Sequence, residues 1–157
     1  MCGARITVNK RRFNMDEHRL FVDKARKLAN YCVEHGFEGT EVLRGMKVSQ
    51  LAGMYDGIGP NWSWHVLASI IDHVSYEFEP AAFLLDVQYK AEFDRSIDMF
   101  HLCNHQFYQN CVKCVKMNYG WWNPKRYSLV RSAKVLYDAC EEHGIESWNS
   151  KGEAKRE

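Results

Sequence analysis

No run of about 18 apolar residues occurs anywhere in the sequence, so no transmembrane helix is expected. Residues 1–13 contain several arginines and lysines but no apolar stretch, and they do not resemble a secretory signal peptide. Only three prolines occur in 157 residues, which argues against a disordered or linker-rich chain. We therefore interpret residues 1–13 as a basic N-terminal arm on an otherwise folded chain.

A large excess of one charge is also missing. The 21 Lys and Arg residues are balanced by 20 Asp and Glu residues, which gives a net charge of +1. A dedicated nucleic-acid-binding protein usually has a stronger basic excess. Two local sets of basic residues could contact phosphates, although a solvated face is the simpler interpretation of both. One set is the N-terminal arm, and the other consists of Lys113, Lys116, Lys125, Arg126, Arg131 and Lys134.

Hydrophobic residues make up 46% of the chain, enough for the core of one small domain. Apolar residues recur at helical spacing, and capping residues mark several helix ends. No convincing strand pattern occurs, so the predicted fold class is all-α, with two long helices after residue 90. The predicted domain spans 14–148 and is followed by a polar tail, 149–157. Helices are predicted over 15–35, 41–52, 62–74, a segment opened by Pro80, about 92–117, and 124–143.

Six cysteines are present, and without a signal peptide we expect reduced thiols in a cytosolic compartment. Cys111 and Cys114 are spaced for one helix face, with histidines nearby, which raises the question of a zinc site. No second Cys-x-x-Cys pair exists, and one helix rarely supplies four tetrahedral ligands, so zinc is not expected. The tryptophans at 62, 64, 121 and 122 are expected to be buried for the most part, with an exposed aromatic platform as the alternative.

The strongest chemical signal combines a glycine-rich loop with a carboxylate in an apolar run. In Tyr55-Asp56-Gly57-Ile58-Gly59-Pro60, the glycines allow a sharp turn that directs successive carbonyls to one point. Asp86 lies within an apolar segment, where a charge must be paired, hydrogen-bonded or metal-bound. Carbonyls plus a carboxylate suit Ca²⁺. A plain turn and a structural buried aspartate remain open as the alternatives.

These motifs resemble those of a known family. Tyr55-x-Gly57-x-Gly59 is similar to the calcium loop of phospholipase A2 enzymes, and Asp86-x-x-Tyr89 to the end of their His-Asp-x-x-Tyr helix motif. A closer resemblance is to phage and prophage proteins of gut bacteria with a phospholipase-A2-like pattern, which share a late run that reads Tyr119-Gly120-Trp121-Trp122-Asn123-Pro124-Lys125-Arg126-Tyr127 in this sequence. The resemblance covers about residues 50–148.

The resemblance implies a site with a missing base. A calcium ion, the one cofactor expected if any is bound, would be held by Tyr55, Gly57, Gly59 and Asp86. The position of the family's catalytic histidine is occupied by Leu85, which cannot accept a proton, and general-base help is typically worth about 10²–10⁴ in rate. The resemblance therefore implies a scaffold without the activity. Further residues expected to line the site are Tyr89, Asp94 and Asp98.

The leading hypothesis is thus a phage- or prophage-derived, non-catalytic binding protein whose partner is a phage or host protein, located in the host cytoplasm or in the virion. One alternative is a calcium-dependent lipid hydrolase whose base has moved, with His65 and His73 as candidates. A second alternative is a nucleic-acid-binding accessory protein that uses the basic arm, which the charge balance makes less favoured.

Overall fold

The computed structural model describes residues 15–55 and 68–153. These residues form α1 (Met15–Glu34), a short 3-10 helix η1 (Thr40–Leu43), α2 (Val48–Met54), α3 (Ala68–Ala91), α4 (Ile97–Asn118), α5 (Pro124–His143) and α6 (Ile145–Glu153). The described ranges contain no strand, so the prediction of an all-α fold is confirmed. Within them, no helix combines the length and apolarity needed to cross a bilayer. The predicted N-terminal arm, Gly57 and Gly59 lie outside the described residues.

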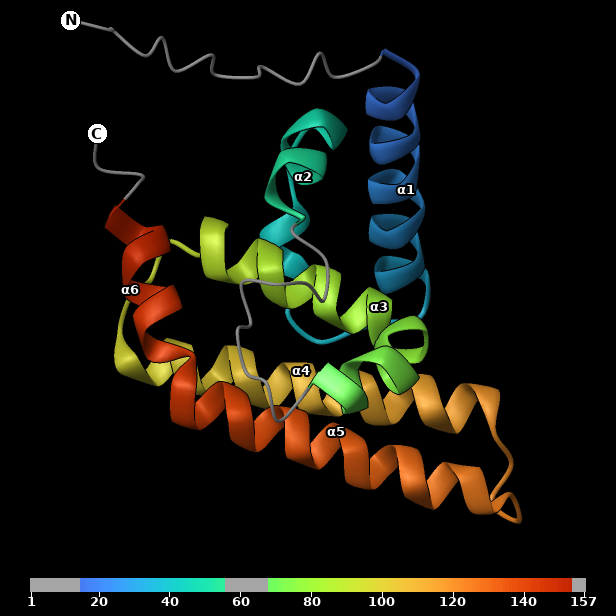
Figure 1. The fold of residues 1–157 in the computed structure, drawn as a ribbon. Coiled ribbons are helices and arrows are strands. Elements are labelled where there is room, and N and C mark those ends of the chain that lie inside the picture. The colour runs from blue at the N-terminus through green and yellow to red at the C-terminus, as the bar shows by residue number, and fades with distance from the viewer. Residues whose placement is uncertain (1–14, 56–67, 154–157) are drawn as a thin grey trace, which may run out of the picture.

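Helix α3 lies at the centre of the fold. It packs against α1 and α2 on one side and against α4 on the other, and α6 contacts it near its C-terminal end (Figure 1). Every residue from 81 to 89 is buried. A helix that is apolar around most of its circumference is stable only when neighbours cover it on all sides. The nearly unbroken apolar run in the sequence therefore becomes the central helix of the protein.

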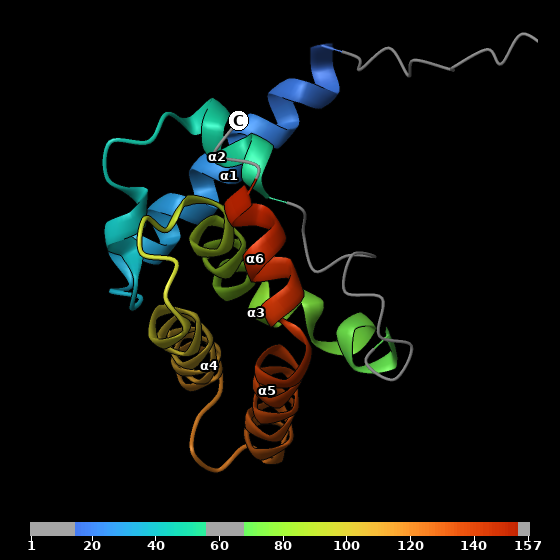
Figure 2. The same cartoon turned by 90° about the vertical axis from the view of Figure 1, so that its left-hand side faces the viewer.

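Pro80 does not open a new helix as predicted, because α3 runs without interruption from Ala68 to Ala91 with Pro80 inside it. Proline has no N–H to donate and crowds the preceding turn, so a helix that continues through it bends. Figure 2 shows the first turns of α3 leaving at an angle from the rest of the helix. The Cys32 thiol donates to the Pro80 carbonyl at 3.4 Å and so connects α1 to this bend.

The single helix predicted over 41–52 is also wrong. Gly45 adopts a φ of 74° and divides the segment into η1 and α2. Glycine enters this left-handed region without the steric penalty that other residues incur there, so it readily ends a helix. Gln50 supports the new start of α2, since its side chain accepts a hydrogen bond from the Lys47 N–H at 2.9 Å.

The two long helices after residue 90 form an antiparallel hairpin, α4 and α5 (Figure 1). Helix α4 begins at Ile97 rather than near 92, because the Ser96 hydroxyl accepts from the Met99 N–H at 3.2 Å and caps the helix. Phe93, which falls within the predicted range of this helix, therefore lies before α4 and is 97% exposed. Helix α5 has the predicted bounds, with Asn123 as its cap and Pro124 in its first turn.

The segment expected to be a polar tail folds back onto the domain. Helix α6 extends to Glu153, and Trp148 within it is only 1% exposed. The guanidinium of Arg95 stacks over the Trp148 ring at 3.7 Å and donates to the carbonyls of Tyr89 and Trp148. Residues up to 153 are thus part of the fold, because one large aromatic side chain anchors them.

Candidate functional site

Asp86 is the charged residue at the centre of the predicted site. It lies in the buried part of α3 and is 4% exposed. Its negative charge contributes to raising the pKa of two neighbours, Tyr55 at the end of α2 and Cys140 on α5, although burial is the larger cause in both cases. The Asp86 charge therefore acts on side chains of both α2 and α5.

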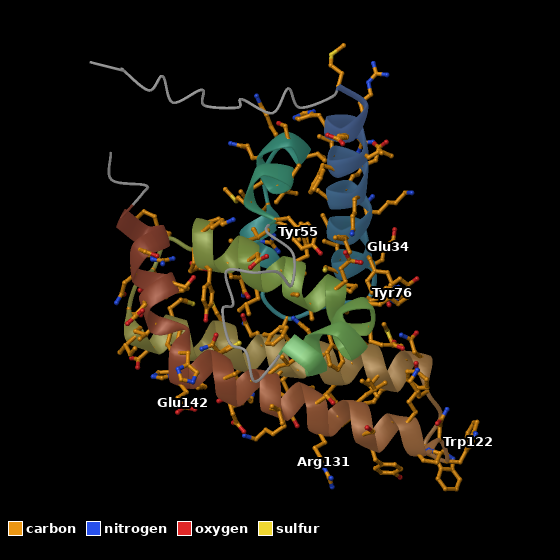
Figure 3. All side chains as sticks on the ribbon, viewed as in Figure 1. Glu34, Tyr55, Tyr76, Trp122, Arg131 and Glu142 are labelled. Carbon is orange, nitrogen blue, oxygen red and sulfur yellow. The ribbon has the colours of Figure 1, made fainter. Side chains whose placement is uncertain are left out.

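The Tyr55 side chain is held firmly at the junction of α1, α2 and α3. Its hydroxyl donates to Glu79 Oε1 at 2.8 Å, and Lys24 Nζ lies 2.5 Å from the same oxygen. The Tyr55 ring packs edge-on against Phe83 with 5.5 Å between centroids. Figure 3 shows Tyr55 beside α2 and α3. These contacts fix the start of the predicted calcium loop.

Half of the predicted calcium ligands can be compared with the structure. Tyr55 and Asp86 are described, and the Asp86 charge contributes to raising the pKa of Tyr55, whereas Gly57 and Gly59 are outside the described residues. In the described part of the chain, no three His, Cys, Asp or Glu side chains are grouped to hold a metal ion. Ca²⁺ takes about six to eight oxygen ligands from carboxylates, carbonyls and waters, so the predicted residues supply ligands of the right kind and water would complete the set.

The other predicted site residues divide into buried and exposed positions. Leu85 is 1% exposed, and Tyr89 is also buried, with its hydroxyl donating to Asn104 Oδ1 at 2.7 Å. Asp94 and Asp98 are exposed near the start of α4, where Asp94 Oδ1 accepts from the Ser96 N–H at 2.9 Å. Burial places Tyr89 in the core, whereas the two aspartates belong to a solvated helix start.

A polar network that sequence reasoning missed leads from Tyr89 to the surface. Asn104, which receives the Tyr89 hydrogen bond, donates to Glu141 Oε1 at 2.8 Å. The other oxygen of Glu141 lies 2.6 Å from Nδ1 of His101, which is exposed. The signal in the sequence was Asn104 on an otherwise apolar helical face. The network orients the His101 ring, because Glu141 contacts Nδ1 and not Nε2.

The five described cysteines are all free and buried. Burial is the main cause that raises the pKa of Cys32, Cys103 and Cys114 to about 12, and it also raises the pKa of Cys111 and Cys140. These thiols are therefore neutral at physiological pH and behave as small apolar side chains.

The prediction of burial is wrong for the two tryptophans that can be checked. Trp121 and Trp122 are each 72% exposed, while Trp62 and Trp64 lie outside the described residues. The two exposed residues lie in the turn between α4 and α5, at the end of the hairpin (Figure 1). Neither is part of the buried core of the described residues.

Comparison with known proteins found no matching family model, no matching curated protein and no matching solved structure. The site is therefore interpreted from the residues and contacts of this chain, and the resemblance to phospholipase A2 remains a prediction.

Proposed function

We propose that this chain is a phage- or prophage-derived, non-catalytic binding protein on a phospholipase-A2-like helical scaffold. The observation that carries the proposal is Leu85, a buried leucine where catalysis would need a base. The two described groups whose pKa values respond to Asp86, the Tyr55 phenol and the Cys140 thiol, both have raised pKa values and stay protonated at neutral pH. An efficient general base needs a pKa near the working pH.

The proposed partner is a protein of the phage or its host, bound by the N-terminal half of α1. This half extends beyond the rest of the described bundle (Figure 2) and exposes Leu20 and Phe21. Exposed apolar side chains bordered by charged ones are typical of protein interfaces. The same half of α1 also borders a shallow pocket beside α2, lined by His18, Arg19, Val22, Asp23, Arg26 and Ser49.

In this proposal, calcium has a structural role. The carbonyls of Tyr55, Gly57 and Gly59 and the carboxylate of Asp86 would hold the ion. A ligand at a hundred times its Kd stabilises the folded state by about 2.7 kcal/mol. We expect calcium to raise the melting temperature of the wild type and to leave that of Asp86→Asn unchanged.

Phospholipid hydrolysis in saturating calcium tests the absence of catalysis. We expect no enzyme-like turnover by the wild type, and a gain with Leu85→His, which supplies the missing base. Leu84→His is the matched control, because Leu84 is equally buried in the same run but does not occupy the position of the base. Enzyme-like turnover by the wild type would show that the proposal is wrong.

One observation favours a second candidate function, a hydrolase with a relocated base. The 2.6 Å contact between His101 and Glu141 resembles the way carboxylates orient catalytic histidines. The earlier candidates cannot be compared, since His65 and the side chain of His73 lie outside the described residues. Any wild-type hydrolysis that His101→Gln abolishes and His105→Gln preserves would support this candidate.

A further inference from the structure

A long stretch of the hairpin of α4 and α5 contains basic residues and no acidic ones. No Asp or Glu occurs between Asp98 and Asp138, although this stretch contains six Lys and Arg residues, while the whole chain has a net charge of only +1. One carboxylate from another helix reaches the end of the hairpin, Glu77 of α3, which lies 3.7 Å from Lys125 Nζ. The hairpin therefore presents a positive surface that the overall charge balance conceals.

The end of the hairpin also exposes a cluster of aromatic side chains. The rings of Trp121 and Trp122 lie 6.0 Å apart at an angle of 86°, and Tyr127 is exposed one helical turn into α5. Figure 3 shows Trp122 at the end of the hairpin, with its ring pointing away from the protein. Large exposed aromatics of this kind mark binding sites more often than they stabilise a monomer.

The turn holds these rings in place. The Trp122 ring lies over Gly120, where a Cβ atom would come within 2.5 Å of it. The Asn123 N–H donates to the Gly120 carbonyl at 3.0 Å, and the Tyr127 hydroxyl donates to the Trp121 carbonyl at 3.1 Å. A rigid aromatic surface loses little conformational entropy when it binds a partner.

Cations continue from the tryptophans along α5. Arg126 and Arg131 have no salt bridge to any carboxylate of the described residues, whereas Lys134 is paired with Asp138. Figure 3 shows Arg131 pointing outward from α5, away from the other helices. Arg131 is seven residues beyond Pro124, which corresponds to about 10 Å along the helix.

We propose that this surface, formed by Trp121, Trp122, Tyr127, Arg126 and Arg131, binds single-stranded nucleic acid. Bases stack on the indole rings, and the arginines contact the phosphates that follow, which is the usual combination in proteins that bind single strands. This surface is distinct from the one on α1, so the inference does not depend on the proposed protein partner.

The arrangement favours a strand over an anionic membrane. A hairpin standing upright on a bilayer would leave Arg131 about 10 Å behind the tryptophans. A hairpin lying flat along α5 would bring Asp138 and Glu142, both exposed, against the anionic headgroups. A nucleic-acid strand can contact both the aromatic rings and the arginines, and it avoids the carboxylates because it can leave the surface before Asp138.

Fluorescence anisotropy with a labelled oligothymidylate of about twelve nucleotides tests the proposal on the full chain. We expect Trp121→Ala and Trp122→Ala each to weaken binding roughly five- to hundredfold, as loss of one base stack does. Arg131→Gln should weaken binding and reduce the slope of log affinity against log salt by about 0.7. Gly120→Ala should also weaken binding, because it displaces the Trp122 ring without removing it.

Two exposed residues elsewhere serve as matched controls. Phe93→Ala removes an exposed aromatic, and Arg44→Gln removes an exposed arginine, so both should leave binding unchanged. The proposal is overturned if the oligonucleotide does not bind at about 50 mM salt. It is also overturned if the hairpin variants bind the oligonucleotide with the same affinity as the wild type. It is equally overturned if vesicles with anionic lipid bind through the tryptophans while the oligonucleotide does not.

Discussion

Replacing Trp148 by alanine should cost a large part of the stability of this protein. Trp148 is the largest fully buried side chain among the described residues, and its ring contacts Tyr89 and Phe100 at centroid distances of 5.4 and 5.9 Å. Removal of a buried Trp side chain typically costs about 3–5 kcal/mol. The Arg95 guanidinium that stacks on the ring adds about 1 kcal/mol. A loss of about 4–6 kcal/mol compares with a total of about 5–15 kcal/mol for a typical domain.

Urea unfolding followed by far-UV circular dichroism measures this loss. With a slope of about 2 kcal/mol per molar urea, the midpoint should fall by about 2–3 M. Trp121→Ala is the matched control, because it makes the same chemical change at an exposed position and should alter stability by at most about 0.5 kcal/mol. A loss below about 1.5 kcal/mol for Trp148→Ala, or equal losses for the two variants, would refute the reasoning that Trp148 anchors α6.

Two further predictions follow from the backbone and from the buried thiols. Gly39→Ala should destabilise the protein by about 1–3 kcal/mol, because Gly39 has a φ of 84° and the new Cβ would displace the Gln88 and Gln106 side chains. Gly53→Ala in α2 is the control, since its Cβ would meet no other atom, and this variant should be neutral or stabilising. Urea unfolding compares the two, and equal effects would contradict the prediction. Stability should also fall as pH rises from about 9 towards 12, since the unfolded thiols ionise near their ordinary pKa of 9.0 while the folded ones retain their protons. Each such thiol lowers the free energy of unfolding by about 1.4 kcal/mol per pH unit in this range. Urea unfolding under reducing conditions at several pH values should show the decline, and the decline should be smaller in Cys103→Ala. A free energy of unfolding that does not change with pH would show that the thiols are not buried.

The contrast between the two faces of α4 bears on both proposals. Its inward face contributes Asn104 to a network that spans three helices, and its outward end leads into the exposed tryptophans. The first arrangement orients His101 and the second presents indole rings to solvent. Hydrolysis assays on His101→Gln and nucleic-acid binding by Trp122→Ala therefore test independent parts of the same hairpin.

The sequence by itself determined those elements whose signals are local. Helices α1 and α5 agree with prediction to within a residue, because apolar periodicity, the cap at Asn123 and the stop at Gly36 all act within a few residues of the chain. The burial of residues 81–89 was also predictable, since a helix that is apolar on nearly every side has no face to expose. The candidate role of Asp86 follows from the same run, because a charge there needs compensation wherever the neighbours come from.

Only the tertiary structure decided features that depend on residues far apart in the chain. Trp148 and Trp122 are the same residue type, but only Trp148 is buried. Arg95, 53 residues earlier in the sequence, covers Trp148, whereas no described helix reaches Trp122. Pro80 could equally have opened a helix, and the packing of α1 against the bend selects the continuous one. Local propensity limits the choices at such positions, and the free energy of long-range packing selects among them.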